Sequence, residues 1–253
     1  MSHMRQALAL ARLALGTTSP NPAVGAVIVR DGVVVGEGFT QPPGHAHAEV
    51  MALQQAGRNS RDASLYVTLE PCCTYGRTPP CTQAIIAAGI SEVHAAITDP
   101  NPRVNGKGLS ELEATGIKVY RGDGEEEARE MYEAFARHVN TGLPFVTAKF
   151  AMSLDGKIAT HTGDSKWVTG PLARGHVQEM RRTCDAIMVG VNTVLRDNPR
   201  LTARDRDGSL LSRQPLRVIL DSKARTPTDA ILLSEPGLTF IAVTRSAADG
   251  RIA

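Results

Sequence analysis

Two stretches of the chain hold the side chains whose types and spacing could do metal chemistry. "HAHAEV" occupies residues 45–50, and "LEPCCTYGRTPPC", residues 69–81, contains three of the four cysteines. Imidazole nitrogen and thiolate sulfur are ligands that zinc prefers, and a catalytic zinc site has three protein ligands with the fourth position left to water. One histidine and two cysteines, His47, Cys72 and Cys81, fit that count.

Glu49 follows the histidine by two positions, at the start of a helix predicted over residues 49–57. It can lie at the same site without binding the metal, because two residues on the first turn of a helix differ in reach. A carboxylate there could take a proton from a zinc-bound water, whose pKa falls to about 7, and pass it to a leaving nitrogen. We therefore predict general acid/base catalysis by Glu49, which is typically worth about 10²- to 10⁴-fold in rate.

The spacing of the cysteines departs from the generic zinc deaminase signature, H-x-E followed by P-C-x-x-C. Eight residues lie between Cys72 and Cys81. Cys81 directly precedes a helix predicted over residues 82–89, whose N-terminus would favour a thiolate. Two other interpretations stay open from the residues alone. One is a closed structural zinc site with Cys73 or His45 as the fourth ligand, and the other is a packing role for the three cysteines.

The elements that must position these residues alternate between strand and helix. A hairpin around Asp31-Gly32 joins two predicted strands, and the helix over 49–57 follows it. Further strands are predicted over residues 64–70, 92–98 and 117–120, and further helices over residues 82–89 and 109–116. The pattern predicts an α/β domain with a central sheet.

A second alternating series begins after a charged helix predicted over residues 124–140. Its predicted elements are a helix over residues 176–183 and strands over residues 145–150, 184–190, 216–220 and 238–243. We therefore divide the chain into domains 1–143 and 144–253. Because about 110 residues is short for an open α/β fold, we expect the second domain to be partial.

Composition excludes several classes of protein. The chain has 253 residues, of which 42% are hydrophobic and 21% charged, as in a globular protein. The net charge is +2 without a long basic run, so nothing indicates a nucleic-acid or membrane partner. No segment approaches the roughly 20 apolar residues of a transmembrane helix. We expect a cytoplasmic protein, in which clustered thiols stay reduced and bind metal rather than form disulfides.

Isolated cysteine and histidine residues outside these stretches carry no chemical signal of their own. Cys184 is interpreted as a buried apolar residue. The remaining isolated histidines are interpreted as surface residues or hydrogen-bonded core residues: His94, His138, His161 and His176.

Several motifs in consistent order carry a resemblance to a known family. They are "TSPNPAVGAVIV", "HAE", "TLEPC", "GRTPPC", "AAGI" and "DPNPRVNGKG". Over residues 4 to about 140 the chain resembles the deaminase half of the bifunctional riboflavin-biosynthesis deaminase/reductase, in which eight residues between the two cysteines are the rule. The resemblance implies a cytidine-deaminase-like three-layer α/β/α domain. It also implies zinc-dependent hydrolytic deamination of diaminohydroxyphosphoribosylaminopyrimidine, a small molecule.

The resemblance assigns roles to five residues. His47, Cys72 and Cys81 correspond to zinc ligands, Glu49 to the proton shuttle, and Asn21 to a contact on the ribose side of the substrate.

One departure from the family follows the first cysteine. Family members commonly carry Ser-His-His or a similar trio there, whereas this chain has Cys73, Thr74 and Tyr75. A histidine that would help to hold the base is therefore absent or replaced by Tyr75. We expect altered base recognition and an intact zinc site.

The second half, from "FVTAKFAMSLDGKIATHTGDSKWVTG" to residue 204, resembles the opening of the reductase domain of the same family. That resemblance implies a dihydrofolate-reductase-like α/β fold that uses NADPH to reduce the ribosyl side chain to ribityl. Residues matching cofactor contacts are Ala151, Trp167, Thr193, Asp197 and Ser222. Residues matching substrate contacts are Ser165, Arg181, Leu201 and Arg204. The two arginines suit a phosphate group.

Each of these positions has a simpler interpretation when taken alone. Trp167 is typical of a core residue, and Asp197, in "RDNP", of a turn. The glycine-rich segment that completes the family's cofactor site would lie beyond residue 253. We therefore expect weak or no binding of NADPH by this chain.

Two competing functions share part of the pattern. A nucleoside or tRNA deaminase has the same H-A-E and P-C elements, but the eight-residue gap and the second domain disfavour it. A non-catalytic zinc module would hold zinc without an exchangeable water. The residues do not decide the oligomeric state, although deaminase folds of this type often assemble as homo-oligomers.

Overall fold

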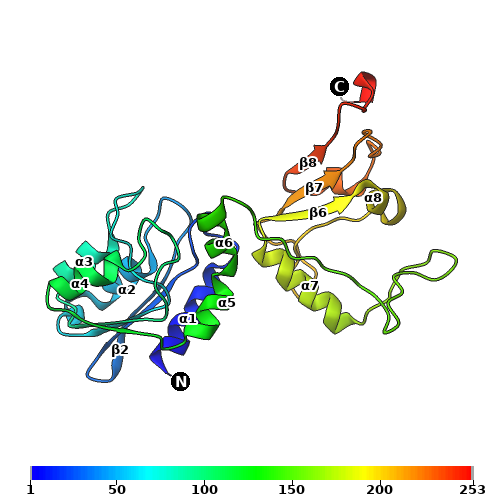
Figure 1. Cartoon of the computed structure of the whole chain (residues 1–253). Coiled ribbons are helices and arrows are strands. Elements are labelled where there is room, and N and C mark those ends of the chain that lie inside the picture. The colour runs from blue at the N-terminus through cyan, green and yellow to red at the C-terminus, as the bar shows by residue number, and fades with distance from the viewer. Residues whose placement is uncertain (1, 252–253) are drawn as a thin grey trace. The chain divides into compact units, whose positions relative to one another are not determined.

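The computed structural model of the chain describes residues 2–251 and divides into two units (Figure 1). The first unit ends at Thr147 and the second begins at Ala148. Each unit has its own sheet. None of the helices in residues 2–251 is both long and apolar enough to cross a bilayer.

The first unit is built on a five-stranded sheet of order β2-β1-β3-β4-β5. Its strands are β1 (Gly25–Arg30), β2 (Val33–Phe39), β3 (Ser64–Val67), β4 (Glu92–Ala95) and β5 (Lys118–Arg121). Its helices are α1 (His3–Ala14), α2 (Ala48–Ala56), α3 (Cys81–Ala88), α4 (Lys107–Ala114), α5 (Glu125–Met131) and α6 (Glu133–Thr141), and a 3-10 turn, η1 (Gly57–Ser60), follows α2. β1 runs antiparallel to β2 and β3, whereas β3, β4 and β5 are parallel. The predicted hairpin is confirmed.

Helices cover both faces of this sheet. A Cβ on Gly25 of β1 would lie 1.9 Å from the Ala7 carbonyl oxygen of α1, and one on Gly38 of β2 would lie 2.3 Å from the Ala48 carbonyl oxygen of α2. Gly38 pairs with Ala26, the neighbour of Gly25, so α1 and α2 lie on opposite faces. α3 packs on α2, and an ion pair joins α5 to α1. The expected three-layer α/β/α architecture is confirmed.

The core of the first unit lies between these layers. Fully buried side chains from every layer meet there, including Leu8, Ile28, Leu65, Ile85 and Leu109. Burying a side chain of this size stabilises the fold by about 1.5–3 kcal/mol. The core therefore fixes α2 and α3, the two helices that carry predicted site residues.

The helix predicted over residues 124–140 is instead two helices, α5 and α6, that meet at Tyr132. Tyr132 is 2% exposed, and its hydroxyl donates to the Ala23 carbonyl oxygen at 3.0 Å and lies 2.6 Å from Thr68 Oγ1. Buried hydroxyl groups need such partners. These tertiary contacts outweigh the local preference for one continuous helix.

The second unit has a parallel three-stranded sheet of order β6-β7-β8. Its elements are α7 (Pro171–Thr183), β6 (Ala186–Gly190), α8 (Val191–Asp197), β7 (Leu216–Leu220), α9 (Ile231–Ser234), β8 (Thr239–Ala242) and a 3-10 turn, η2 (Asp249–Arg251). The strand predicted over residues 145–150 is wrong, because these residues are exposed and irregular. A strand needs a neighbour for its backbone hydrogen bonds, and none of the strands in residues 2–251 pairs with this segment.

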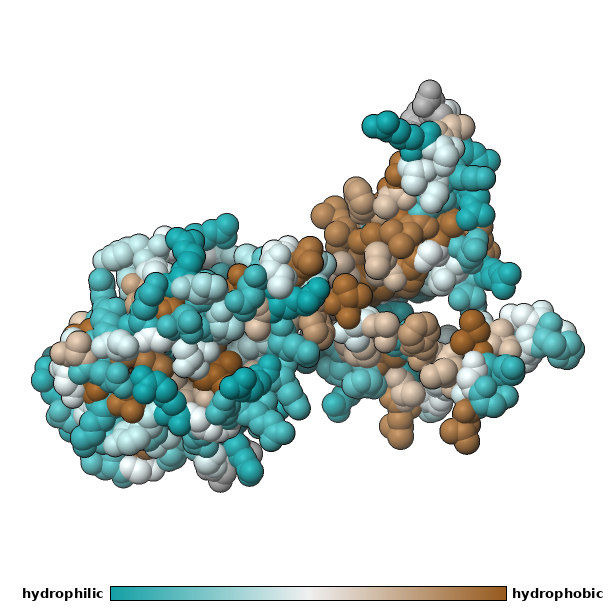
Figure 2. Space-filling model, viewed as in Figure 1, coloured by the Kyte–Doolittle hydropathy of each residue, from teal (hydrophilic) through white to brown (hydrophobic). Residues whose placement is uncertain are grey.

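One face of the second sheet is covered and the other is open in the described part of the chain. Ile219 packs with Val194 of α8 and Leu232 of α9 in a small core. On the opposite face Met188, Val218 and Phe240 lie in register across the three strands, and Met188 and Phe240 are 56% and 58% exposed. Figure 2 shows apolar side chains gathered on the surface of this unit.

Candidate active site

The histidine and two cysteines predicted as metal ligands come together in the first unit. His47 Nδ1 lies 3.6 Å from Cys72 Sγ and 3.3 Å from Cys81 Sγ. The three ligand atoms all lie within 4.8 Å of one another. Tetrahedral bonds of normal length to zinc would place nitrogen and sulfur roughly 3.6 Å apart. The donor set and its spacing therefore fit a zinc ion.

Each ligand stands at the end of an element that fixes its position. His47 is the residue before α2, Cys81 is the first residue of α3 after Pro80, and Cys72 lies in the segment that follows β3. His47 Nε2 lies 3.3 Å from Thr78 Oγ1, so the ring presents Nδ1 to the sulfur atoms. Hydrogen bonds of this kind orient metal-ligating histidines.

The two thiols have pKa values displaced in opposite directions. The Cys81 backbone N–H donates to Cys72 Sγ at 3.4 Å. A hydrogen bond from the Cys81 thiol, helped by this N–H and by His47, holds the pKa of Cys72 well below its ordinary value. The same thiol contact and burial raise the pKa of Cys81. The lowered pKa of Cys72 favours its thiolate, which is the form that binds metal.

The alternative of a closed structural zinc site requires Cys73 or His45 as a fourth ligand. In the part of the chain that the structure describes, the group of residues able to hold a metal contains neither Cys73 nor His45. Three protein ligands remain, which is the number found in catalytic zinc sites.

Glu49 lies beside this group, in the first turn of α2. Its side chain is 4% exposed, and burial, followed by the charge of Cys72, raises its pKa to about 7. A carboxyl group with a pKa near neutrality can accept a proton and return it at neutral pH. The structure thus gives Glu49 the environment that a proton shuttle needs.

A cavity of about 430 Å³ is lined by Glu49 and by two of the three ligand residues, His47 and Cys72. Asn21, predicted as a substrate contact, lines the same cavity, in the loop before β1. Eight further polar or aromatic residues also line it and had no predicted role: Thr40, Glu70, Arg77, Thr78, Asp99, Asn101, Phe135 and His138. The sequence could have indicated a site role for Arg77 and Asn101, since both stand in motifs that carry the family resemblance. No sequence motif indicated such a role for His138, which was interpreted as a surface or core residue but lines the cavity.

Of the residues at which this chain differs from the family pattern, 73–75, it is Thr74 rather than Tyr75 that reaches the cavity. Thr74 lines the cavity. Tyr75 is 72% exposed, and its hydroxyl donates to Gln83 Oε1 at 2.9 Å outside it. The idea that Tyr75 replaces a base-holding histidine is therefore wrong, and a small hydroxyl side chain occupies the cavity at this point.

In the second unit, the two predicted phosphate-binding arginines lie around one residue. Arg181 Nη1 donates to the Thr202 carbonyl oxygen at 3.0 Å, and Arg204 Nε donates to Thr202 Oγ1 at 3.1 Å. Leu201, another predicted substrate contact, is buried next to Thr202. Ser165 lies in an irregular segment and is half-buried.

Three of the five predicted cofactor contacts lie in the segments that directly follow β6 and β7. Thr193 and Asp197 are on α8, which follows β6, and Ser222 follows β7. β6 and β7 are parallel, so their carboxyl ends share an edge, where open α/β sheets bind ligands.

The other two predicted cofactor contacts lie on irregular chain. Ala151 is in an irregular segment, and Trp167 is 72% exposed, with the guanidinium carbon of Arg174 4.8 Å from its ring centroid. The interpretation of Trp167 as a core residue is therefore wrong. Lys166 Nζ donates to the Asp197 carbonyl oxygen at 3.4 Å, which brings this segment to α8.

Comparison with known proteins finds a different family in each half of the chain. Residues 1–97 match the family described as "Cytidine and deoxycytidylate deaminase zinc-binding region", and residues 144–253 match "RibD C-terminal domain". The riboflavin biosynthesis protein RibD of Aquifex aeolicus is 47% identical over 96% of this chain and 68% of its own length. That of Escherichia coli is 44% identical over 96% of this chain and 69% of its own length. The chain belongs to the RibD family.

Solved structures of the family agree with this assignment. Acinetobacter baumannii RibD has a TM-score of 0.87 and 44% identity, covering 95% of this chain and 68% of that one. The deaminase/reductase of Thermotoga maritima has a TM-score of 0.87 and 43% identity, covering 98% of this chain and 71% of that one. The chain therefore spans about two thirds of the length of these relatives. It joins a zinc-dependent deaminase domain of riboflavin biosynthesis to a reductase domain, which confirms the predicted fold class and family.

Proposed function

We propose that the first unit deaminates diaminohydroxyphosphoribosylaminopyrimidine by zinc-dependent hydrolysis. One observation carries the proposal: the buried carboxyl group of Glu49, with a pKa of about 7, lies beside a group of three metal ligands, and Glu49, His47 and Cys72 line a cavity of about 430 Å³. The Thermotoga maritima relative is described as a diaminohydroxyphosphoribosylaminopyrimidine deaminase, which supports this substrate.

The reaction replaces the amino group on a ring carbon by oxygen. His47, Cys72 and Cys81 would hold the zinc ion, which when bound supplies a Lewis acid that makes water nucleophilic near neutral pH. Glu49 accepts a proton from the attacking water as the new C–O bond forms. It then returns that proton to the departing nitrogen, so the C–N bond breaks and ammonia leaves. The carboxyl group ends each cycle in its starting protonation state.

Recognition of the substrate is proposed to come from the cavity walls. The amide of Asn21 can donate to and accept from ribose hydroxyls. Arg77 is an exposed cation among the cavity residues, and a guanidinium suits a phosphate oxygen pair. Thr74 offers only one hydroxyl where the family commonly has a histidine, so we propose a weaker hold on the base.

We also propose that the second unit contributes to NADPH-dependent reduction of the ribosyl side chain of 5-amino-6-(5-phosphoribosylamino)uracil. Bound NADPH would supply the hydride. Ala151, Trp167, Thr193, Asp197 and Ser222 would contact it, and three of these residues lie in the segments that follow the carboxyl ends of β6 and β7, where open α/β sheets bind ligands. Ser165 and Leu201 would contact the sugar, and Arg181 and Arg204, which both donate to Thr202, would bind the substrate phosphate.

Ammonia release by zinc-loaded protein tests the proposed deamination. Glu49→Gln should lower kcat by about 10²- to 10⁴-fold while zinc content stays at one ion per chain, because only the proton shuttle is lost. Cys81→Ser should lower zinc content itself. Equal rates for wild type and Glu49→Gln would disprove the mechanism, and release of ammonia from cytidine but not from the pyrimidine phosphate would disprove the substrate.

A further inference from the structure

Glu70 is a buried carboxyl group that the deamination steps do not use. It stands in the "TLEPC" motif, two residues before the metal ligand Cys72, and is 3% exposed. Burying a carboxylate is costly unless hydrogen bonds compensate for the lost water. The partners of this carboxylate therefore show what it holds in place.

Four backbone N–H groups donate to the Glu70 side chain. Those of Asp99 and Gly106 donate to Oε2 at 2.9 and 2.8 Å. Those of Gly108 and Leu109 donate to Oε1 at 2.8 and 3.3 Å. A single side chain thus ties both ends of the segment 99–109 to the chain that leads into Cys72.

Two of these donors belong to the first turn of α4. The first N–H groups of a helix have no partner within the helix, and a capping side chain commonly satisfies them. The residue before α4 is Gly106, which has no side chain to do so. Glu70 supplies the cap from a distant part of the sequence, and its negative charge suits the positive end of the helix dipole.

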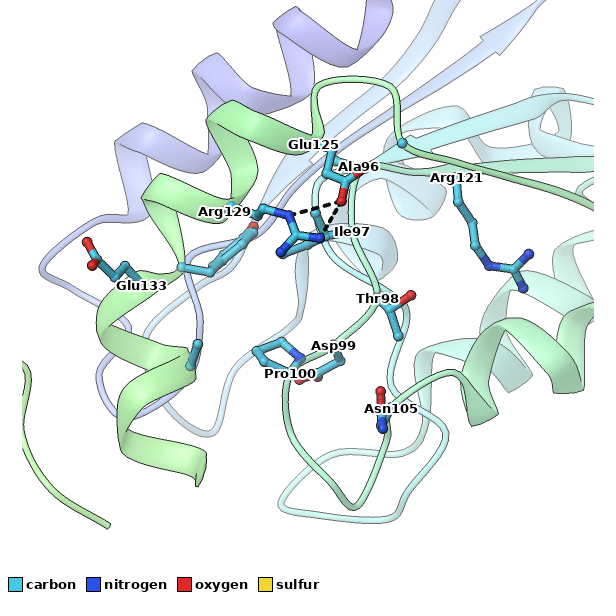
Figure 3. Close-up of a pocket in the computed structure, with 13 residues that line it drawn as sticks. Ala96, Ile97, Thr98, Asp99, Pro100, Asn105, Arg121, Glu125, Arg129 and Glu133 are labelled. Atoms are coloured by element: carbon cyan, nitrogen blue, oxygen red, sulfur yellow. Dashed lines mark hydrogen bonds and ion pairs between the residues drawn. The ribbon is translucent and has the colours of Figure 1, made fainter. Parts of the chain in front are cut away.

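The segment held in this way forms a wall of the active site. Asp99, Asn101 and Val104 line the cavity that His47 and Cys72 also line, and Glu70 itself reaches this cavity. Asp99 also lines a second cavity, of about 610 Å³, together with Pro100 and Asn105 (Figure 3). Because the loop has a cavity on each side, it depends on its attachment points for its position.

The packing around Glu70 leaves no room for adjustment. A Cβ on Gly108 would lie 2.1 Å from the Pro71 carbonyl oxygen and 3.2 Å from Glu70 Oε1. The start of α4 therefore rests directly on the peptide that precedes the first cysteine ligand.

We infer that Glu70 is a positioning residue for substrate binding. Its carboxylate holds the segment 99–109 at a fixed distance from the metal-ligating segment, so that Asp99 and Asn101 are placed to contact the substrate. The inference rests on the proposed deamination, and it assigns to Glu70 an effect on KM rather than on the chemical step.

Glu70→Gln tests the inference because it keeps the size of the side chain and replaces one acceptor oxygen by an NH₂ group. That NH₂ group would face N–H donors of the wall. KM for the pyrimidine phosphate should rise by about 10-fold or more, the effect of losing hydrogen bonds to a charged group. kcat per bound zinc should stay within about 3-fold of wild type, since Glu49 and the ligands are untouched. Glu130→Gln, at an exposed glutamate of α5, is the matched control and should change neither.

Amide hydrogen exchange separates the inference from the proposed function. In Glu70→Gln the amides of residues 99–109 should exchange about 10-fold faster or more, while those of α2 should not change. Unchanged exchange in the wall, or faster exchange with an unchanged KM, would overturn the inference. A merely structural role would lower zinc content and the folded fraction without changing the KM of the folded protein.

If wild-type protein releases no ammonia, the proposed function fails and exchange in the wall alone decides the role of Glu70. If Glu70→Gln does not fold, Gly108→Ala takes its place. That variant keeps the carboxylate but pushes α4 away from Pro71, and it should raise KM in the same way.

Discussion

Replacing Glu49 by glutamine should stabilise the zinc-free first unit, and the gain should grow with pH. Burial raises the pKa of Glu49 to about 7 in the folded chain, against an ordinary value of 4.5. The folded state therefore binds this proton more tightly than the unfolded state. Below pH 4.5 Glu49 is protonated in both the folded and the unfolded state, so it does not lower the free energy of unfolding. As pH rises from 4.5 through 7, stability is lost, because the unfolded chain releases the proton first.

The size of the effect follows from the two pKa values. The two pKa values differ by about 2.5, and each pKa unit corresponds to about 1.4 kcal/mol. The free energy of unfolding that is lost through ionisation of Glu49 therefore levels off at about 3 kcal/mol above pH 8. At pH 5 the cost is about 1 kcal/mol or less. Glutamine keeps the shape but never ionises, so it removes the pH-dependent part.

Urea unfolding in the presence of a chelator measures this difference. All four tyrosines lie in residues 1–147 and the single tryptophan is Trp167, so tyrosine signals report the first unit. The free energy of unfolding of Glu49→Gln minus that of wild type should rise by about 2–3 kcal/mol between pH 5 and pH 8.5. Glu130→Gln, at an exposed position, should show no such rise. A difference that is the same at both pH values would refute the reasoning.

Two further predictions concern the core contact and the second unit. Tyr132→Phe removes the hydroxyl that bonds to Ala23 and Thr68, and should lower the free energy of unfolding of the first unit by about 1–3 kcal/mol, measured with the same urea assay. NADPH should bind weakly in a fluorescence titration, because Ala151 and Trp167, two of the five predicted contacts, lie on irregular chain whose ordering would cost conformational entropy. Saturable binding with turnover would contradict that expectation.

Local sequence patterns were sufficient for most elements of the first unit. The Asp31-Gly32 hairpin, and the helices that start at or next to the site residues, follow from turn residues and apolar periodicity. The predictions of secondary structure that were wrong concern segments whose conformation depends on contacts with distant parts of the chain. The Tyr132 hydroxyl finds its partners in the loop before β1 and just after β3, and this ends a helix that periodicity predicts as continuous. Residues 145–150 have the composition of a strand, but within the described residues 2–251 no strand lies beside them.

The sequence alone determined the chemistry available to the protein. One histidine, two cysteines and a glutamate at these spacings indicate a zinc site with a proton shuttle, because ligand preference and reach depend on residue type. Only the tertiary structure decided how those groups behave. Burial sets the pKa of Glu49, the path of the chain puts Thr74 rather than Tyr75 in the cavity, and Glu70 holds a wall that lies 29 residues or more away along the chain. Burial and long-range hydrogen bonds depend on what the folded chain brings together, which no local pattern records.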